Sequence, residues 1–189
     1  MNRYIIWLKC IFSILYWPIF RFMNYTIQKQ DLQKWCEVLI VSKYRSEFLT
    51  FIKLFATLKE YRNLVLWRGG VEWLPCPREN IHFVTKPEKI QSGLVFQHGF
   101  STIIFAETIG CNVQIWQNVT IGRKHKYSGN PIIGNNVKIC TGAIVLGSIK
   151  IGDNSIIGAG AVVTKDIPKN SVVVGNPARI IKTIQDDKF

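Results

Sequence analysis

With 189 residues, of which 48% are hydrophobic and 19% charged, the chain is long enough for one repeat domain and a smaller helical region, and its composition excludes an intrinsically disordered protein. The formal net charge is +12, yet Lys and Arg are spread along the chain. This charge does not indicate a nucleic-acid partner and fits an anionic cofactor or membrane surface equally well. The five cysteines show no CxxC spacing, which argues against a disulfide framework or a zinc site and favours a cytoplasmic protein.

Residues 1–80 are predicted to form an α-helical region, because apolar residues recur at spacings of three and four. Examples are Leu32, Trp35, Cys36 and Leu39. Within this region, residues 4–25 are rich in aromatic side chains flanked by cations, which suits packing on a partner helix or subunit, or peripheral contact with the cytoplasmic membrane. Lys9 and Pro18 interrupt the apolar run, so we do not expect it to span a bilayer.

From Ile109 onward, β-branched residues recur with a period of six. A period of six is not a multiple of 3.6, so it excludes an amphipathic helix and is typical of a prism in which each unit forms a short strand and a tight corner. We therefore predict a mainly β fold, a parallel β-helix of hexapeptide repeats over residues 81–182, followed by a tail at 183–189. The periodic positions are Ile109, Ile115, Ile121, Ile133, Ile139, Val145, Ile151, Ile157 and Val163.

Two interruptions of the period mark candidate functional sites, because repeats tend to lose their register at functional sites. Residues 123–131 (RKHKYSGNP) lie between Ile121 and Ile133, which are two periods apart, so we expect a loop that leaves the solenoid and returns in register. Upstream, the period shows a one-residue slip around His98. The upstream positions are Ile90, Phe96 and Ile103.

Several segments of this region resemble the hexapeptide-repeat acetyltransferases. They are Gln97-His98-Gly99, VTIG at 119–122, IGAGAVVTKDIP at 157–168 and GNPARIIK at 175–182. The resemblance is closest to the serine acetyltransferase branch and, within it, to bacterial enzymes that O-acetylate surface polysaccharide. It implies a left-handed parallel β-helix, a homotrimer, and acetyl-CoA bound between neighbouring solenoids as the donor of an acetyl group to a hydroxyl.

The resemblance also implies that His98 is the catalytic general base. An imidazole titrates near neutral pH and can take the proton of a hydroxyl as its oxygen attacks the thioester. The Asp that orients the ring in the serine enzymes is matched here by Phe83. Glu88, Glu107 or a backbone carbonyl are the candidates left for that role.

Two departures from the serine enzymes concern the acceptor. Their acid before the catalytic histidine is Gln97 here, and the histidine of their loop is matched by Asn130-Pro131, while this loop carries His125. We expect Gln97, His125 and Asn130 to bind the acceptor. Because a sugar has no ammonium or carboxylate to match, we expect a sugar hydroxyl of a capsule, exopolysaccharide or O-antigen, with serine O-acetylation in cysteine biosynthesis as the alternative.

Six residues fall at positions that line the coenzyme A groove in the related sugar acetyltransferases. Small residues let a pantetheine chain lie against the coil, and cations suit the nucleotide phosphates. The six are Thr141, Ala159, Thr164, Lys165, Arg179 and Lys182.

Two functions of other kinds stay open at this stage. A zinc-dependent carbonic anhydrase on the same solenoid needs three converging histidines, and only His98 of the three in this chain lies in the regular repeats, so we expect no metal. The other is a non-catalytic β-helix scaffold, because a repeat period specifies a fold and not a chemistry.

Overall fold

The computed structural model of the chain describes residues 11, 13–18, 20–21, 25–39, 46–70 and 80–184. Contacts divide the chain into two compact units, Met1–Glu79 and Asn80–Phe189. Within the described ranges, no helix is long and apolar enough to cross a bilayer. Much of the segment 4–25, for which membrane or subunit contact is expected, lies outside those ranges, as do residues 185–189 of the expected tail.

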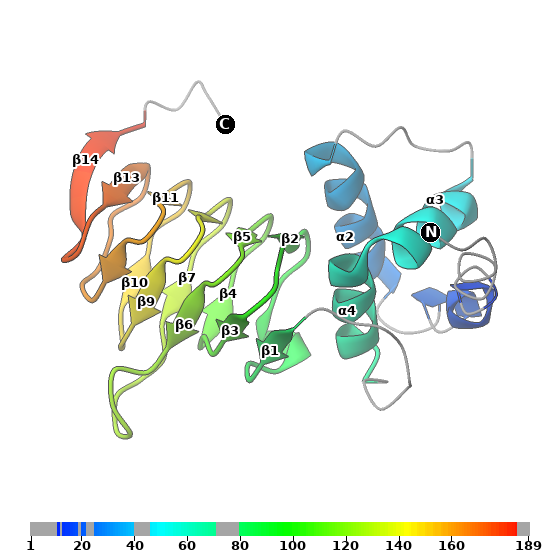
Figure 1. Ribbon diagram of the computed structural model, residues 1–189, viewed down its shortest axis with the longest axis horizontal. Helices are drawn as coiled ribbons and strands as arrows, with labels where there is room; N and C mark the ends of the chain where they lie inside the picture. Colours follow the sequence, from blue (N-terminus) through cyan, green and yellow to red (C-terminus); the bar gives the residue numbers. More distant parts are fainter. Residues whose placement is uncertain are drawn as a thin grey trace. The chain divides into compact units, whose positions relative to one another are not determined.

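The described residues of the first unit are mainly helical, as the spacing of its apolar residues predicts (Figure 1). Phe51 lies in an aromatic cluster, with its ring centroid 4.5 Å from that of Phe20 and 5.3 Å from that of Phe55. A buried ion pair adds a polar contact, with Arg68 Nε 2.6 Å from Asp31 Oδ2. The helices of the first unit that Figure 1 labels are α2 (Tyr25–Val38), α3 (Glu47–Thr57) and α4 (Lys59–Arg68).

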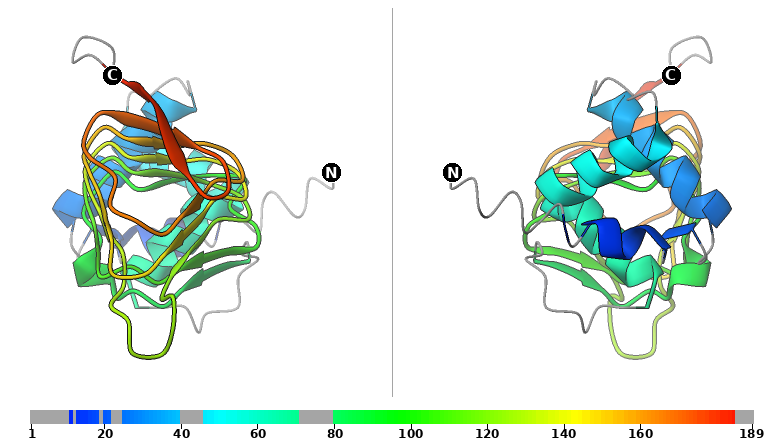
Figure 2. Two further views of the ribbon diagram at one scale, coloured as in Figure 1. Left: turned by 90° about the vertical axis from the view of Figure 1, so that its left-hand side faces the viewer. Right: turned by 90° about the vertical axis from the view of Figure 1, so that its right-hand side faces the viewer.

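The second unit is a parallel β-helix built from three sheets, and it has a roughly triangular outline when viewed along its axis (Figure 2). Sheet 1 contains β1 (Ile81–Phe83), β3 (Thr102–Ile104), β6 (Thr120–Gly122), β9 (Ile144–Leu146) and β12 (Val162–Val163). Sheet 2 contains β4 (Thr108–Ile109), β7 (Ile132–Ile133) and β10 (Lys150–Ile151). Sheet 3 contains β2 (Val95–Gln97), β5 (Gln114–Trp116), β8 (Lys138–Ile139), β11 (Ile156–Ile157), β13 (Ser171–Val174) and β14 (Arg179–Thr183).

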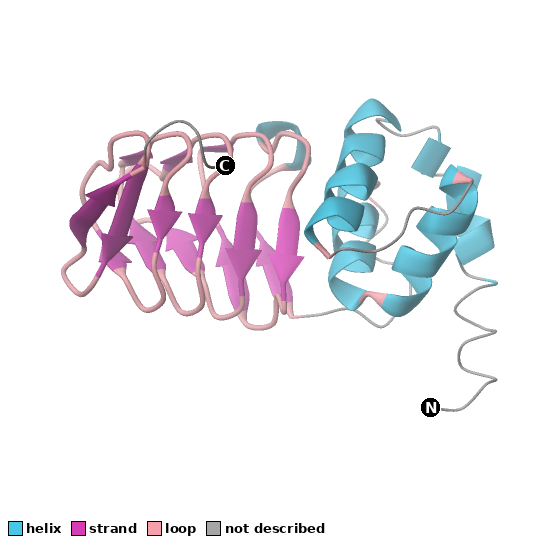
Figure 3. Cartoon of the chain, turned by 90° about the horizontal axis from the view of Figure 1, so that it is seen from above, coloured by secondary structure: helices cyan, strands magenta, loops and turns pink. Residues whose placement is uncertain are grey.

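Strands of successive coils stack side by side (Figure 3), and their backbone pairing is parallel up to the last pair. The last strand, β14, turns back and pairs with β13 in the antiparallel sense. A short 3-10 helix, η1 (Pro87–Lys89), follows β1. The strand order within each sheet therefore follows the coils of a single solenoid.

The periodic side chains point into the axis of the solenoid, as predicted. Along sheet 3 they form a continuous stack that is at most 2% exposed to solvent. Each buried aliphatic side chain of this kind stabilises the fold by roughly 1.5–3 kcal/mol. The stack consists of Phe96, Ile115, Ile139, Ile157 and Val173.

The predicted upstream position Ile103 is wrong. Its neighbour Ile104 is the buried partner of Ile121, whereas Ile103 is 43% exposed. Five residues, 98–102, connect Gln97 to Ile103, but three, 117–119, connect their partners Trp116 and Thr120. The corner at His98 thus holds two extra residues. The step from Ile104 to Ile109 is five residues, one fewer than the period of six. The two changes together give the predicted slip of one residue.

The predicted loop at 123–131 projects from the stack between β6 and β7 (Figure 1). Ile109 pairs with Ile133 in the next coil, 24 residues later, whereas Ile133 pairs with Ile151 only 18 residues later. The first of these coils therefore contains six extra residues. They are accommodated in the loop because the strands on either side keep their parallel register.

A column of asparagines supports the edge between sheet 2 and sheet 3, which we call the asparagine edge. Asn112, Asn136, Asn154 and Asn170 each adopt a left-handed φ between 56° and 60°. Their side-chain amides bond along the column, with N···O distances of 3.3, 3.0 and 2.9 Å. Asn tolerates positive φ better than other residues with a Cβ, so one residue type meets both the backbone and the hydrogen-bonding requirement.

We predict that Asn136→Ala lowers the free energy of unfolding by about 2–4 kcal/mol, because it places an alanine at positive φ and removes two ladder hydrogen bonds. Asn118→Ala is the matched control. Asn118 has a φ of 58°, is exposed and belongs to a different corner. The decrease in the free energy of unfolding of Asn118→Ala should therefore reflect backbone strain alone, about 1–2 kcal/mol. Denaturant unfolding of both variants measures the difference, and equal losses would show that the ladder contributes nothing.

Candidate active site

Two edges of the prism carry the residues predicted to form the site. The His98 edge links sheet 3 to sheet 1, and the loop edge links sheet 1 to sheet 2. The His98 edge carries His98, Thr141 and Ala159, which lie one or two residues after β2, β8 and β11 of sheet 3. The loop edge carries the loop 123–131 together with Thr164, Lys165, Glu88 and Glu107.

His98 follows β2 directly and is exposed, with a left-handed φ of 54°. Within the described ranges, the non-glycine residues with positive φ are His98, Ser101 and five asparagines. Positive φ is uncommon for residues that carry a Cβ, and such backbone conformations cluster at functional sites. The Phe100 N–H donates to His98 O at 2.8 Å and closes the turn. This corner therefore presents the imidazole to solvent at the edge of the solenoid.

Gly99 makes the corner possible, although the sequence analysis assigned it no role. A Cβ at this position would lie 2.6 Å from Ile81 Cδ1 and 3.1 Å from Phe96 Cβ. The backbone therefore passes directly over the core with no room for a side chain. The available signal in the sequence was a glycine placed directly after the candidate histidine.

The candidates for orienting the imidazole do not lie beside it within one chain. Glu88 is in η1 and Glu107 precedes β4, so both are on the loop edge. Glu107 accepts a hydrogen bond from Lys89 Nζ at 3.0 Å, in a pair whose side chains are about half exposed. Phe83, which stands in place of the orienting Asp, packs its ring against that of Phe96, with the centroids 5.7 Å apart.

The acceptor residues are divided between the two edges. Gln97 ends β2 beside His98 and is half-buried, whereas His125 and Asn130 belong to the loop. His125 is exposed. Asn130 Oδ1 accepts a hydrogen bond from Arg123 Nε at 3.1 Å, so it already has a partner within the loop.

The loop has an ordered base and a cationic tip. Ser128 Oγ accepts hydrogen bonds from the backbone N–H groups of Lys124 and His125, at 3.0 and 3.2 Å. The Arg123 guanidinium lies over the ring of Phe105, 4.7 Å from its centroid. Ser128 has no signal in the sequence, because its role depends on how the loop closes on itself.

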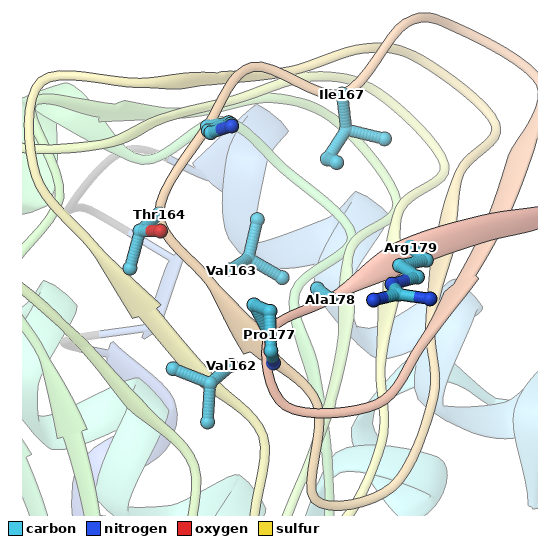
Figure 4. Close-up of a pocket in the computed structure, with 8 residues that line it drawn as sticks. Val162, Val163, Thr164, Ile167, Pro177, Ala178 and Arg179 are labelled. Atoms are coloured by element: carbon cyan, nitrogen blue, oxygen red, sulfur yellow. The ribbon is translucent and has the colours of Figure 1, made fainter.

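A pocket of about 300 Å³ brings together three of the six predicted cofactor residues, Thr164, Lys165 and Arg179 (Figure 4). The Ala178 N–H donates to Val162 O at 3.0 Å and holds the segment before β14 over sheet 1. Lys182 is exposed on β14, outside the pocket lining. The lining consists of Val162, Val163, Thr164, Lys165, Ile167, Pro177, Ala178 and Arg179.

Burial raises the pKa of the Cys140 thiol, against a smaller opposite effect of Lys138. Cys140 directly precedes Thr141, so it is the thiol on the predicted cofactor side of sheet 3. A raised thiol pKa leaves less thiolate near neutral pH and makes Cys140 a poor nucleophile. The raised pKa therefore argues against a covalent enzyme intermediate at Cys140.

The described part of the chain contains no group of three or more His, Cys, Asp and Glu side chains arranged to hold a metal ion. His82 lies in β1, His98 on the His98 edge and His125 in the loop. The structure does not bring the three histidines together within one chain.

The repeat region is similar in sequence to known acetyltransferases. Residues 130–165 match the family model described as "Bacterial transferase hexapeptide (six repeats)". A putative serine acetyltransferase of Schizosaccharomyces pombe is 44% identical over 94 residues, 48% of this chain and 34% of the relative. The serine acetyltransferase of Staphylococcus aureus strain Mu50 is 47% identical over 97 residues, 50% of this chain and 46% of the relative. The chain therefore spans less than half the length of these curated relatives.

Solved structures of serine acetyltransferases share the fold. The enzyme of Neisseria gonorrhoeae superposes with a TM-score of 0.64 at 24% identity, over 86% of this chain and 66% of that one. The enzyme of Brucella abortus strain S19 in complex with coenzyme A gives a TM-score of 0.57 at 28% identity, over 85% of this chain and 68% of that one. The solenoid is thus a left-handed parallel β-helix, as the resemblance implies.

The expectation of a sugar hydroxyl in surface polysaccharide is wrong. The relatives and structural neighbours are named serine acetyltransferases, which favours the serine alternative. The expectation depended on two substitutions, at Gln97 and at Asn130-Pro131. A glutamine side chain can still accept hydrogen bonds from an ammonium group, so the loss of an acid there does not by itself exclude an amino acid.

Proposed function

We propose that this chain, whose repeat region is that of a hexapeptide-repeat acetyltransferase in the serine acetyltransferase-like branch, transfers an acetyl group from acetyl-CoA to the hydroxyl of serine. The observation that carries the proposal is the exposed His98 in a strained, two-residue-longer corner of a solenoid whose relatives are named for this reaction. A strained corner with an exposed imidazole suits a residue that must reach a substrate.

In this proposal the His98 imidazole accepts the proton of the serine hydroxyl as the hydroxyl oxygen attacks the thioester carbonyl. A tetrahedral oxyanion forms, and backbone N–H groups of the coil are suited to stabilise it. Collapse of the intermediate breaks the carbon–sulfur bond, and the imidazolium returns its proton to the coenzyme A thiolate. The products are O-acetylserine and coenzyme A, and the enzyme returns to its starting state.

The pocket beside Arg179 supports acetyl-CoA as the co-substrate. Lys165 and Arg179 place two cations at its lining, and guanidinium and ammonium groups suit the phosphates of the cofactor. On the His98 edge, Thr141 and Ala159 offer a path of small side chains toward the base. The solved enzyme of Brucella abortus with coenzyme A, at 28% identity, adds support for this ligand.

We propose a homotrimer, because the candidate residues of one chain lie on two different edges of its prism. His98, Thr141 and Ala159 are on one edge, whereas Thr164, Lys165 and the loop are on another. A groove between two solenoids lets the His98 edge of one chain face the loop edge of its neighbour. Light scattering should give three times the mass of the chain, and full activity of an isolated single chain would contradict the shared site.

We predict that His98→Ala lowers kcat for acetyl transfer to serine by about 10²- to 10⁴-fold, since the hydroxyl loses its general base. His82→Ala, which removes an exposed histidine of β1, is the matched control and should retain activity. Release of coenzyme A thiol and mass spectrometry of O-acetylserine measure the rate. A folded wild-type protein that transfers no acetyl group to serine would contradict the proposal and leave a non-catalytic scaffold as the remaining class.

We predict that Arg179→Ala raises KM for acetyl-CoA by about three- to tenfold and leaves KM for serine unchanged, because a charge-assisted contact to phosphate is lost. Lys169→Ala removes the same charge from an exposed residue of the asparagine edge and serves as the control. Steady-state kinetics with each substrate varied in turn measures both constants. Equal effects of the two variants would contradict a phosphate-binding role for Arg179.

We also propose that the N-terminal region contacts the cytoplasmic membrane peripherally. Ile11, Ile14 and Leu15 are each at least 50% exposed, and no acidic residue occurs before Asp31 in the sequence. An apolar helix face beside cations suits an anionic lipid surface. We predict co-sedimentation with vesicles containing anionic lipid, reduced by Leu15→Ser, and equal recovery with and without vesicles would contradict this contact.

A further inference from the structure

Gln117 occupies the coil position next to the corner that carries His98. Gln97 and Trp116 are Cα partners in the β2–β5 pair, and His98 and Gln117 are the residues that follow them. Across the same corner, the Asn118 N–H donates to Phe100 O at 3.0 Å. Backbone pairing therefore holds Gln117 against the turn that presents the imidazole.

The side-chain oxygen of Gln117 has an unusual environment. Gln117 Oε1 is buried and accepts no hydrogen bond from any described residue. A buried carbonyl without a donor costs about 1–3 kcal/mol, so a protein retains one where it serves another purpose. This oxygen is therefore an acceptor that lacks a donor. Gln117 follows β5 directly, just as His98 follows β2, and the two strands are paired.

Three other acceptors at this corner already have donors. His98 O accepts from the Phe100 N–H, and Phe100 O accepts from the Asn118 N–H. The Thr102 hydroxyl lies within hydrogen-bonding distance of Trp116 O, at 3.3 Å. Glu88 and Glu107 lie on the loop edge instead.

We infer that Gln117 is the positioning residue of the proposed base, and that its side-chain carbonyl accepts the N–H of the His98 ring nitrogen that faces away from the acceptor hydroxyl. This inference depends on the function proposed for His98. A general base needs one bare ring nitrogen, and an acceptor held against the other nitrogen selects that tautomer. When the ring takes the hydroxyl proton, the second N–H keeps the same partner, so no proton has to leave the pair during the step.

A neutral amide in this position has a different effect from a carboxylate. It fixes the orientation and tautomer of the ring while adding no negative charge to stabilise the imidazolium. Gln117→Glu should therefore shift the acidic limb of the kcat/KM profile to higher pH. Gln117→Met, which keeps the length of the side chain and removes the carbonyl, should leave that limb in place and lower kcat by roughly 10- to 100-fold, with KM for acetyl-CoA within a factor of about two.

A direct test that does not depend on turnover uses the three histidines of the chain. Nitrogen-15 NMR of histidine-labelled protein reports the tautomer of each ring, and the signals are assigned with His98→Ala, His82→Ala and His125→Ala. We expect one dominant tautomer for His98 in the wild type and a mixture in Gln117→Met, with His82 and His125 unchanged as internal controls. Gln117→Asn, which retracts the carbonyl by one methylene, should give an intermediate mixture.

Two results would overturn the inference. One is a His98 tautomer ratio that is identical in the wild type, Gln117→Met and Gln117→Glu, with thermal melting showing that the variants are folded. The other is a pH profile of Gln117→Glu that does not move. If the wild type transfers no acetyl group, the tautomer measurement still decides whether Gln117 holds the ring, so failure of the positioning role and failure of the proposed reaction are distinguishable.

Discussion

Parallel pairing between coils is the constraint on which every other feature of the repeat unit depends. Each strand is two or three residues long over most of the stack, far too short to be stable alone. A strand is held because the strands before and after it in the same sheet satisfy its backbone groups, and because its inward side chain stacks on theirs. Phe96, Ile115 and Ile139 are one such column. The fold therefore resists changes inside the strands and concentrates variation at the corners.

This constraint explains why both departures from the period lie between strands. The corner at His98 gains two residues and the coil around the loop gains six, while the pairing on either side is preserved. The longer corner has two left-handed residues, His98 and Ser101, where the corresponding corner of the next coil has one, Asn118. The proposed chemistry thus lies where the solenoid has freedom, and the stack supplies a rigid base for it.

Much of the solenoid could be predicted from the sequence because its period is strict, and the buried positions from Ile109 to Val163 follow from spacing alone. The prediction for Ile103 was wrong because the corner before it is two residues longer than in the next coil, whereas the step from Ile104 to Ile109 is one residue shorter than the period. The spacing in the sequence shows only the net shift of one residue. The roles of Gly99 and Gln117 could not be predicted in this way. They depend on a close approach to Ile81 and on burial of one oxygen, and both are properties of neighbouring coils.

The candidate site was predicted less completely than the fold for a related reason. Thr164, Lys165 and Arg179 meet at one pocket although Arg179 lies more than a dozen residues further along the chain, because β14 folds back over the last coil. Glu88 and Glu107 are close to His98 in sequence but lie on another edge of the prism. In a coil with three faces, a sequence separation of about ten residues places two side chains on different sides of the molecule. The two substitutions, at Gln97 and at Asn130-Pro131, predict a sugar acceptor, whereas relatives of the whole repeat region are named serine acetyltransferases.

The reversed direction of β14 has a consequence for the size of the assembly. A parallel β-helix that ended on β13 would leave a strand edge of the same kind that joins every pair of coils, and another solenoid could add to it end to end. The antiparallel β14 covers that edge, and an irregularity between Val172 and Val173 bends the pair out of the regular register. At the last coil, the sheet 3 edge is therefore already paired, so a further solenoid could not add a strand to β13.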